Sequence, residues 1–302
     1  MATIITTKIA TEANVITHGG IFHADEVLAT VMLSKIIDNL TVLRTFKVPE
    51  DISDEVIIYD IGGGKFDHHQ KGGNGVRENG VPYAAAGLIW KEFGSQILAN
   101  SCNPEVVWKM LDRDLVQGVD AIDNGTLPKL DYEAKPMNFS AIISSFNPTW
   151  DSSESPDDCF LKAVAFAETV FDNILKNAES KAKAQEIIDA AIESSEGHIM
   201  VLDRFVPWQE FLFSSVNEKA EEIQFAVFPS LRGGYNWQCV PDSLGGFGQR
   251  KPVPAEWKGL NGAALQEVTG IATAIFCHPA GFIGSAETLE DAIKLAELAI
   301  NS

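Results

Sequence analysis

The 302-residue sequence predicts an α/β fold with two domains. Its length lies at the point where a single hydrophobic core stops growing, near ~250–300 residues. In the first half, short apolar runs alternate with helically spaced runs, which favours a parallel sheet. After Gly197 strand patterns return, now mixed with helices, which predicts a second, α+β domain. We expect the first domain to cover 1–195 and the second 196–302.

The first half begins with an apolar strand at 14–17 and a helix at 25–39 that has acids in its first turn. Further segments follow in order: strands at 41–48 and 55–60, a Gly-rich segment at 61–80, and helices at 84–98 and 104–116. The run at 55–60 is β-branched and apolar, which is typical of a strand buried in a parallel sheet.

The second half is introduced by a turn-rich break at 147–156. The amphipathic stretch from about 157 to 195 predicts one long helix or two broken ones linking the domains. The remaining expected elements are strands at 198–202, 223–228, 235–240 and 273–277, and helices at 262–268 and 286–299.

Composition narrows the class of protein. The formal net charge is −19, which repels long polyanions and favours short substrates or a local basic patch. No run approaches the ~20 apolar residues of a membrane span, so no membrane partner is expected. The start of the sequence has no signal or transit pattern, and the four cysteines lack metal-knuckle spacing, so we expect a cytoplasmic location. The sequence leaves open whether the chain forms a homo-oligomer.

Histidines and acids gather in three groups that follow expected secondary structure. The groups are His18, His23 and Asp25; Asp60, Asp67, His68 and His69; and Asp120, Asp123 and Asn124. The first two groups follow the ends of two expected strands, and the third is expected in a loop after the helix at 104–116. Ligands collect at the carboxyl ends of parallel strands, so we expect all three groups to meet at one edge.

Imidazole nitrogens and carboxylate oxygens without thiolates suit Mn²⁺, Mg²⁺, Fe²⁺, Co²⁺ or Zn²⁺. Several carboxylates in one place repel each other unless cations neutralise them. Two metal ions about 3.5–4 Å apart can activate water and stabilise an in-line phosphoryl displacement. The residues therefore predict metal-assisted hydrolysis of a phosphate ester or anhydride.

Four motifs in order, THGGIFHADE, DHHQ, VDAIDNG and GIATAIFCHPAGFIGS, resemble the Myg family over nearly the whole chain. That family is described as an RNA exonuclease. The Asp67-His68-His69 tripeptide after Asp60 is also similar to the DHH phosphoesterase superfamily, which includes exonucleases, oligoribonucleases and manganese-dependent pyrophosphatases. The resemblance implies a DHH-like metal-binding domain, a C-terminal substrate-binding domain, and an active site in the cleft between them.

The resemblance also implies roles for individual residues. The implied metal ligands are His18, His23, Asp25, Asp60, His68 and Asp120. His69 would hold or protonate phosphate oxygens and Asp67 would orient the imidazoles. Asp123 is the reserve ligand, and Asn124 a substrate contact. The first motif departs from the superfamily pattern, because His23 replaces an acid and follows a gap one residue longer.

The expected second domain would supply cations to the substrate. Bases exceed acids in 230–260, which contains Arg250 and Lys251 between turn-rich stretches. His278 follows an expected strand and precedes Gly281, in a loop whose backbone N–H groups could approach a phosphate. We expect these four residues to bind substrate.

These expectations combine into one leading function. The chain would be a metal-dependent phosphodiesterase that degrades short RNA or oligonucleotides, as a 3′–5′ exoribonuclease with two Mn²⁺ ions. Two alternatives stay open. One is a small-molecule phosphohydrolase such as a manganese-dependent pyrophosphatase, and the other is a metal-binding interaction protein without catalysis.

Overall fold

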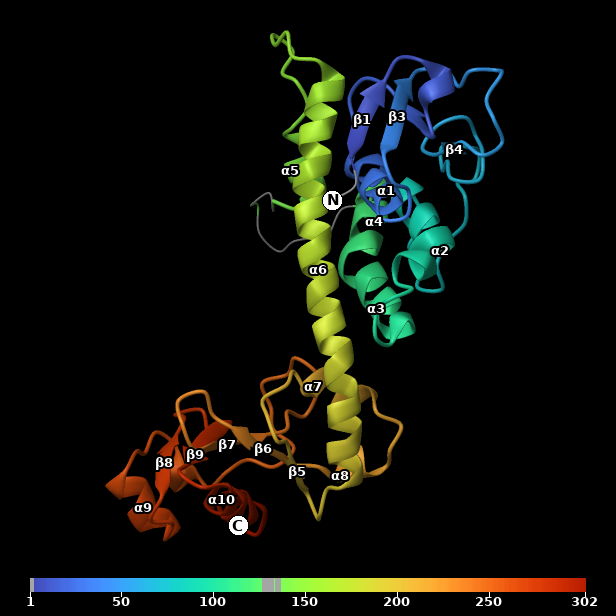
Figure 1. Cartoon of the computed structure of the whole chain (residues 1–302). Coiled ribbons are helices and arrows are strands. Elements are labelled where there is room, and N and C mark those ends of the chain that lie inside the picture. The colour runs from blue at the N-terminus through green and yellow to red at the C-terminus, as the bar shows by residue number, and fades with distance from the viewer. Residues whose placement is uncertain (1–2, 127–132, 134–136) are drawn as a thin grey trace. The chain divides into compact units, whose positions relative to one another are not determined.

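A computed structural model of the chain describes residues 3–126, 133 and 137–302. It contains two compact units, residues 1–179 and 180–302, and helix α6 (Pro156–Glu193) runs from the first into the second (Figure 1). The predicted α/β class is confirmed. The functional boundary expected at residue 195 stays a prediction, as does a site in a cleft between domains.

The first unit contains a four-stranded parallel sheet. Its strands are β1 (Ile4–Thr7), β2 (Val15–His18), β3 (Leu40–Thr45) and β4 (Ile57–Ile58), in the order β1-β3-β2-β4. All neighbouring strands pair in parallel, as expected. Strand β1 was not predicted, because it is half exposed and its apolar residues do not alternate clearly. Strand β4 is shorter than the expected 55–60, because the backbone of Asp60 turns away with φ of 58°.

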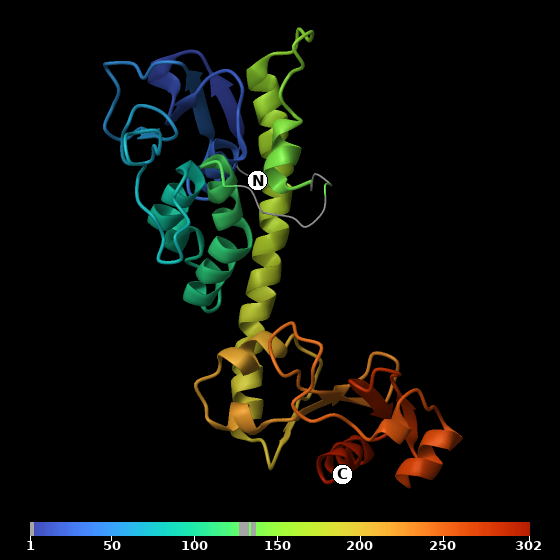
Figure 2. The same cartoon turned by 180° about the vertical axis from the view of Figure 1, so that it is seen from behind.

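Helices pack beside this sheet. They are α1 (Ala24–Ser34), α2 (Ala85–Ile97), α3 (Pro104–Leu111), α4 (Gln117–Asp123) and α5 (Phe139–Ser144). Helix α1 is buried on every side, including its polar residues Asp25, Glu26, Thr30 and Ser34. It contacts α2, α4 and α5, while α2 also contacts α3 and α4 (Figure 1 and Figure 2).

The region after α3 differs from the expected loop. The helix continues through a π-helical turn at Asp112–Val116 directly into α4, so Asp120 and Asp123 lie on a helix. The prediction of a loop was wrong because no Gly or Pro breaks the run until Gly118, which the helix accommodates. Residues three apart on a helix are neighbours on one face, yet the Asp120 carboxylate contacts Arg77 and Gly87, whereas that of Asp123 contacts His68.

The stretch at 157–195 forms a single helix, α6, rather than two. Its first part packs on the first unit through Phe160, whose ring meets Phe22 edge-on at 5.6 Å. The guanidinium of Arg44 lies 4.5 Å from the Phe160 ring centre and pairs with Asp157 at 3.1 Å.

The second unit has a five-stranded mixed sheet in the order β5-β6-β7-β9-β8. The strands are β5 (Ile199–Val201), β6 (Phe225–Pro229), β7 (Tyr235–Cys239), β8 (Ala274–Cys277) and β9 (Ile283–Ala286). Its helices are α7 (Gln209–Ser214), α8 (Lys219–Glu222), α9 (Ala263–Thr269) and α10 (Leu289–Ile300). Helix α10 packs on β6, β7 and β9. Among the described residues, no helix combines the length and apolarity needed to cross a bilayer.

Candidate metal centre

The site begins where β2 and β4 end side by side. These strands pair in parallel, so His18 at the end of β2 lies next to Asp60 just beyond β4. The distance from His18 Nε2 to Asp60 Oδ2 is 3.3 Å, and that from His18 Nε2 to Glu26 Oε1 is 2.8 Å. The expected meeting of residues at the carboxyl edge of the sheet is thus observed for these groups.

Helix α1 contributes the next side chains from its first turn. His23 caps the helix, and both carboxylate oxygens of Glu26 accept the His23 backbone N–H at 2.9 Å in a capping box. Asp25 Oδ2 accepts the backbone N–H of Ala85 at 3.3 Å. The partial positive charge of the helix N-terminus stabilises these two buried acids.

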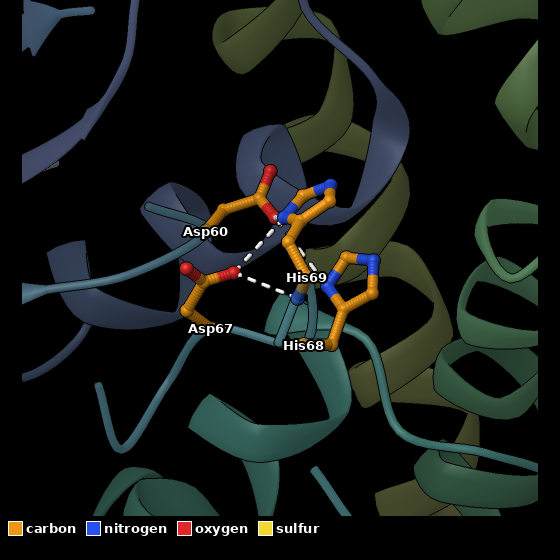
Figure 3. Close-up of side chains that lie close together, drawn as sticks. All are labelled: Asp60, Asp67, His68 and His69. Carbon is orange, nitrogen blue, oxygen red and sulfur yellow. Dashed lines mark hydrogen bonds and ion pairs between the residues drawn. The ribbon is translucent and has the colours of Figure 1, made fainter. Parts of the chain in front are cut away.

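The Asp67-His68-His69 loop returns the chain to the same edge (Figure 3). Asp67 accepts the backbone N–H of Gly63 at 2.7 Å, and its Oδ1 accepts the backbone N–H of His69 at 3.0 Å. Asp67 Oδ1 also lies 2.9 Å from His69 Nδ1. These bonds fix the loop, and they hold the pKa of Asp67 below its ordinary value despite burial. The orienting role expected for Asp67 is consistent with this placement.

His68 stands at the centre of the group. Its Nε2 lies 2.9 Å from Asp123 Oδ2, and its Nδ1 lies 3.4 Å from Asp60 Oδ1 and 4.0 Å from Asp25 Oδ2. The ring of His69 packs beside it with 4.2 Å between centroids. Carboxylates from three other segments, Asp25, Asp60 and Asp123, therefore converge on one imidazole.

Potential ligand atoms lie close enough to surround a cation. Overlapping sets with atoms within 4.8 Å of one another are Asp60, Asp67, His68 and His69; His18, His23 and Glu26; His23, Asp25 and Asp123; and Asp25, Glu26 and Asp60. Asp25 Oδ1, both carboxylate oxygens of Asp60 and His68 Nδ1 are buried without a hydrogen-bond partner. Such unpartnered groups cost free energy, and a divalent cation would satisfy them. The residues present therefore fit a cation site with N and O ligands.

The pKa values of these buried side chains reflect the crowding of charged groups at the site. Burial raises the pKa of Asp25 well above its ordinary value, and the carboxylates of Asp60, Glu26 and Asp123 raise it further. Burial also raises the pKa of Asp60, against the opposing effect of His18. Burial opposes protonation of His18, but the neighbouring carboxylates of Asp60 and Glu26 raise its pKa to about 10. Among the described residues, no lysine or arginine pairs with Asp25 or Asp60.

Asp120 does not join this group. Its carboxylate lies 2.8 Å from Arg77, which also pairs with Asp112 at 2.8 Å, and Oδ1 accepts the backbone N–H of Gly87 at 2.9 Å. A Cβ at Gly87 would lie 1.8 Å from Asp120 Oδ2, so only glycine admits this contact. Asp123, the alternative, occupies the position among the histidines that was expected of Asp120.

Asn124 follows Asp123 at the end of α4. Its Nδ2 donates to the carbonyl oxygens of Tyr83 and Asp120, at 3.3 and 2.9 Å. It nevertheless lines the cavity that opens beside the histidines, so the substrate contact expected of it stays a prediction.

The residues expected to bind substrate lie in the second unit, and each already forms hydrogen bonds there. Arg250 donates to the carbonyl oxygens of Ala220 at 2.6 Å and Ile223 at 2.9 Å. Lys251 donates to the carbonyl oxygen of Ser302 at 3.0 Å. The described contacts of His278 and Gly281 also lie within the second unit: Ala280 N donates to His278 Nδ1, Gly281 N donates to the His278 carbonyl, and Cys239 Sγ donates to the Gly281 carbonyl. Their substrate roles stay predictions.

Glu26 was not expected among the candidate ligands. It is buried, contacts His18, and shares a set with Asp25 and Asp60. Its signal was present in the sequence, because an acid three residues after a helix-capping residue marks a capping box. No pattern in the sequence pointed to Arg77, because its partners Asp112 and Asp120 lie on helices that are distant in sequence.

Comparison with known proteins places the chain in a family. A family model described as "Uncharacterised protein family (UPF0160)", MYG1_exonuc, matches residues 14–300. The chain belongs to this family. The MYG1 protein YER156C of Saccharomyces cerevisiae is 32% identical over 94% of each chain. The MYG1 exonucleases of Mus musculus and Homo sapiens are 31% and 30% identical over 93% of this chain, and over 83% and 84% of theirs.

No solved structure matches this chain. The resemblance to the Myg family is thus confirmed, while the wider relation to DHH phosphoesterases stays a prediction. The matched range of the MYG1 family model includes all the histidines and acids of the cluster, from His18 to Asp123.

Proposed function

We propose that this protein is a metal-dependent nuclease that hydrolyses phosphodiester bonds of short RNA as an exonuclease. One observation carries the proposal: buried carboxylate and imidazole atoms without partners converge at one sheet edge, in a chain whose relatives include proteins named exonucleases. The net charge of −19 favours short substrates over long duplexes.

The chain's own residues divide the work in this proposal. His18, His23, Asp25, Asp60, His68 and Asp123 hold divalent cations, with Mn²⁺ the first to test, and Glu26 supports them. Bound cations supply Lewis acidity that stabilises charge on phosphate oxygens and lowers the pKa of water. Asp67 orients His69, whose ring is more than half exposed and can meet a phosphate oxygen. Asp120 keeps a structural role beside Arg77.

The experiment follows degradation of a short 5′-labelled RNA with added Mn²⁺. The variant His68→Ala should abolish cleavage, because it removes the imidazole at the centre of the cluster. The matched control is His198→Ala, since His198 lies in the second unit and its side chain contacts only the Glu222 carbonyl among described hydrogen bonds. A stepwise ladder supports the proposed 3′–5′ direction, whereas immediate release of labelled mononucleotide indicates the reverse.

Absence of RNA cleavage by Mn²⁺-loaded protein would overturn the exonuclease proposal. Hydrolysis of pyrophosphate under the same conditions would then identify a small-molecule phosphohydrolase. Metal binding without hydrolysis of either substrate would identify a non-catalytic metal protein.

A further inference from the structure

A cavity of about 750 Å³ opens directly beside the metal cluster. One wall contains His23, His68, His69 and Asp123. Its volume falls in the range of pockets that enclose small organic ligands, ~300–1,000 Å³. This space exceeds what a phosphate group alone would fill.

Residues of α5 form another part of the cavity wall. Ser140 and Ser144 lie one helical turn apart, with Ala141 beside them, so all three line the cavity. Asn138 precedes the helix and caps it, because its Oδ1 accepts the Ala141 backbone N–H at 2.9 Å. The sequence folds this way locally because asparagine favours the N-cap position.

This wall carries neutral polar groups that are available to a ligand. No described residue forms a hydrogen bond with the hydroxyls of Ser140 and Ser144 or with the Nδ2 of Asn138. Ile122 and Ala141 add apolar surface between them. The lining thus offers hydroxyl and amide groups together with apolar area.

The α5 part of the cavity wall differs in charge from the part formed by the histidines and Asp123. Within the described part of the chain, the residues that line the cavity include neither lysine nor arginine. Proteins bind phosphates largely through those two side chains, so the described lining residues offer no such partner to a second phosphate group. A sugar and base are uncharged, and their hydroxyls and ring edges match the neutral polar wall.

We propose that this cavity binds the nucleoside moiety of the terminal nucleotide, with its phosphate facing the histidines and carboxylates. The inference rests on the proposed function and specifies its substrate class as a nucleotide rather than pyrophosphate. Asn138, Ser140, Ala141 and Ser144 then determine which substrates enter.

Two variants fill the cavity without touching the cluster. Ala141→Phe places a ring in the space, and Ser140→Leu does so with a smaller side chain should the first variant fail to fold. Ser145→Leu is the matched control, because Ser145 is exposed at the end of the same helix and does not line the cavity. Circular dichroism verifies the fold of each variant.

The first measurement is saturation-transfer NMR with adenosine and uridine on metal-free protein, which requires neither metal nor catalysis. Calorimetry on the Mn²⁺-loaded protein then compares adenosine monophosphate with inorganic phosphate. We expect nucleoside saturation in the wild type and its loss in Ala141→Phe. We also expect about tenfold weaker nucleotide binding in that variant, with phosphate binding changed by less than about twofold.

Nucleoside signals that survive both cavity-filling variants would overturn the inference, as would equal affinity of the wild type for nucleotide and phosphate. The two proposals fail separately. If RNA is not cleaved but Ala141→Phe abolishes nucleoside binding, the cavity assignment stands without the nuclease. If RNA is cleaved and neither filling variant changes binding, the nuclease stands without the cavity assignment.

Discussion

Asp60→Asn should stabilise the metal-free protein while destroying its metal site. Both carboxylate oxygens of Asp60 are buried without hydrogen bonds, and burial raises the pKa of this acid. An unsatisfied buried polar group costs about 1–3 kcal/mol, and the nearby His18 and His68 recover part of that for a charged Asp60. Asparagine also tolerates φ of 58° well. We therefore expect a gain of about 1 kcal/mol, or about 2–4 °C in Tm for a unit of this size.

Asp67→Asn is the matched control, and it should have the opposite effect. Asp67 accepts hydrogen bonds from Gly63 and His69, so an amide there loses an acceptor and the charge assistance. The loss is about 2 kcal/mol, or about 4–8 °C in Tm. The assay is thermal unfolding in chelator and again with Mn²⁺. A fall in Tm for metal-free Asp60→Asn, or an undiminished shift of its Tm on adding Mn²⁺, would refute the reasoning.

Three further outcomes follow from the same contacts. Arg77→Ala should destabilise the fold by about 3–5 kcal/mol in urea unfolding, because it leaves the buried Asp112 and Asp120 without their cation; a loss below about 1 kcal/mol would contradict this. Gly87→Ala should displace Asp120 and lower Tm while metal affinity changes little, since Asp120 lies outside the cluster. Mn²⁺ binding should release protons, because the raised pKa of about 10 keeps His18 protonated at neutral pH and a ligating imidazole must lose that proton. Affinity should therefore weaken as pH falls, and calorimetry in two buffers of different ionisation enthalpy measures the release, which His18→Gln should reduce.

Local patterns in the sequence were sufficient to predict the first two groups of the site. His18 ends an apolar strand, and Asp60 follows another, so parallel pairing brings them together. The carboxyl-edge rule required only that both strands belong to one sheet. The acids expected in the first turn of the helix at 25–39 extended the same reasoning into α1, although Glu26 itself was not expected as a ligand.

The third group could not be resolved from sequence, because two acids three residues apart on one helix compete for the same position. Asp123 faces the histidines, whereas Asp120 faces α2. That choice depends on Arg77 and Gly87, which are distant in sequence and form the pocket for Asp120 only in the folded chain. The π-helical turn before α4 also changes the angle at which both side chains leave the helix.

The pair of acids around Arg77 provides an internal comparison for the metal proposal. Asp112 and Asp120 are as buried as the acids of the cluster, and the chain supplies an arginine between them. At the sheet edge, Asp25 and Asp60 are equally buried, and no lysine or arginine among the described residues pairs with either. Among the described residues, the only side chains paired with them that can carry a positive charge are histidines, which commonly bind metal ions. The same unit thus neutralises one buried acidic pair with its own arginine, and the lack of such a partner at the other pair supports the proposal that a metal cation binds there.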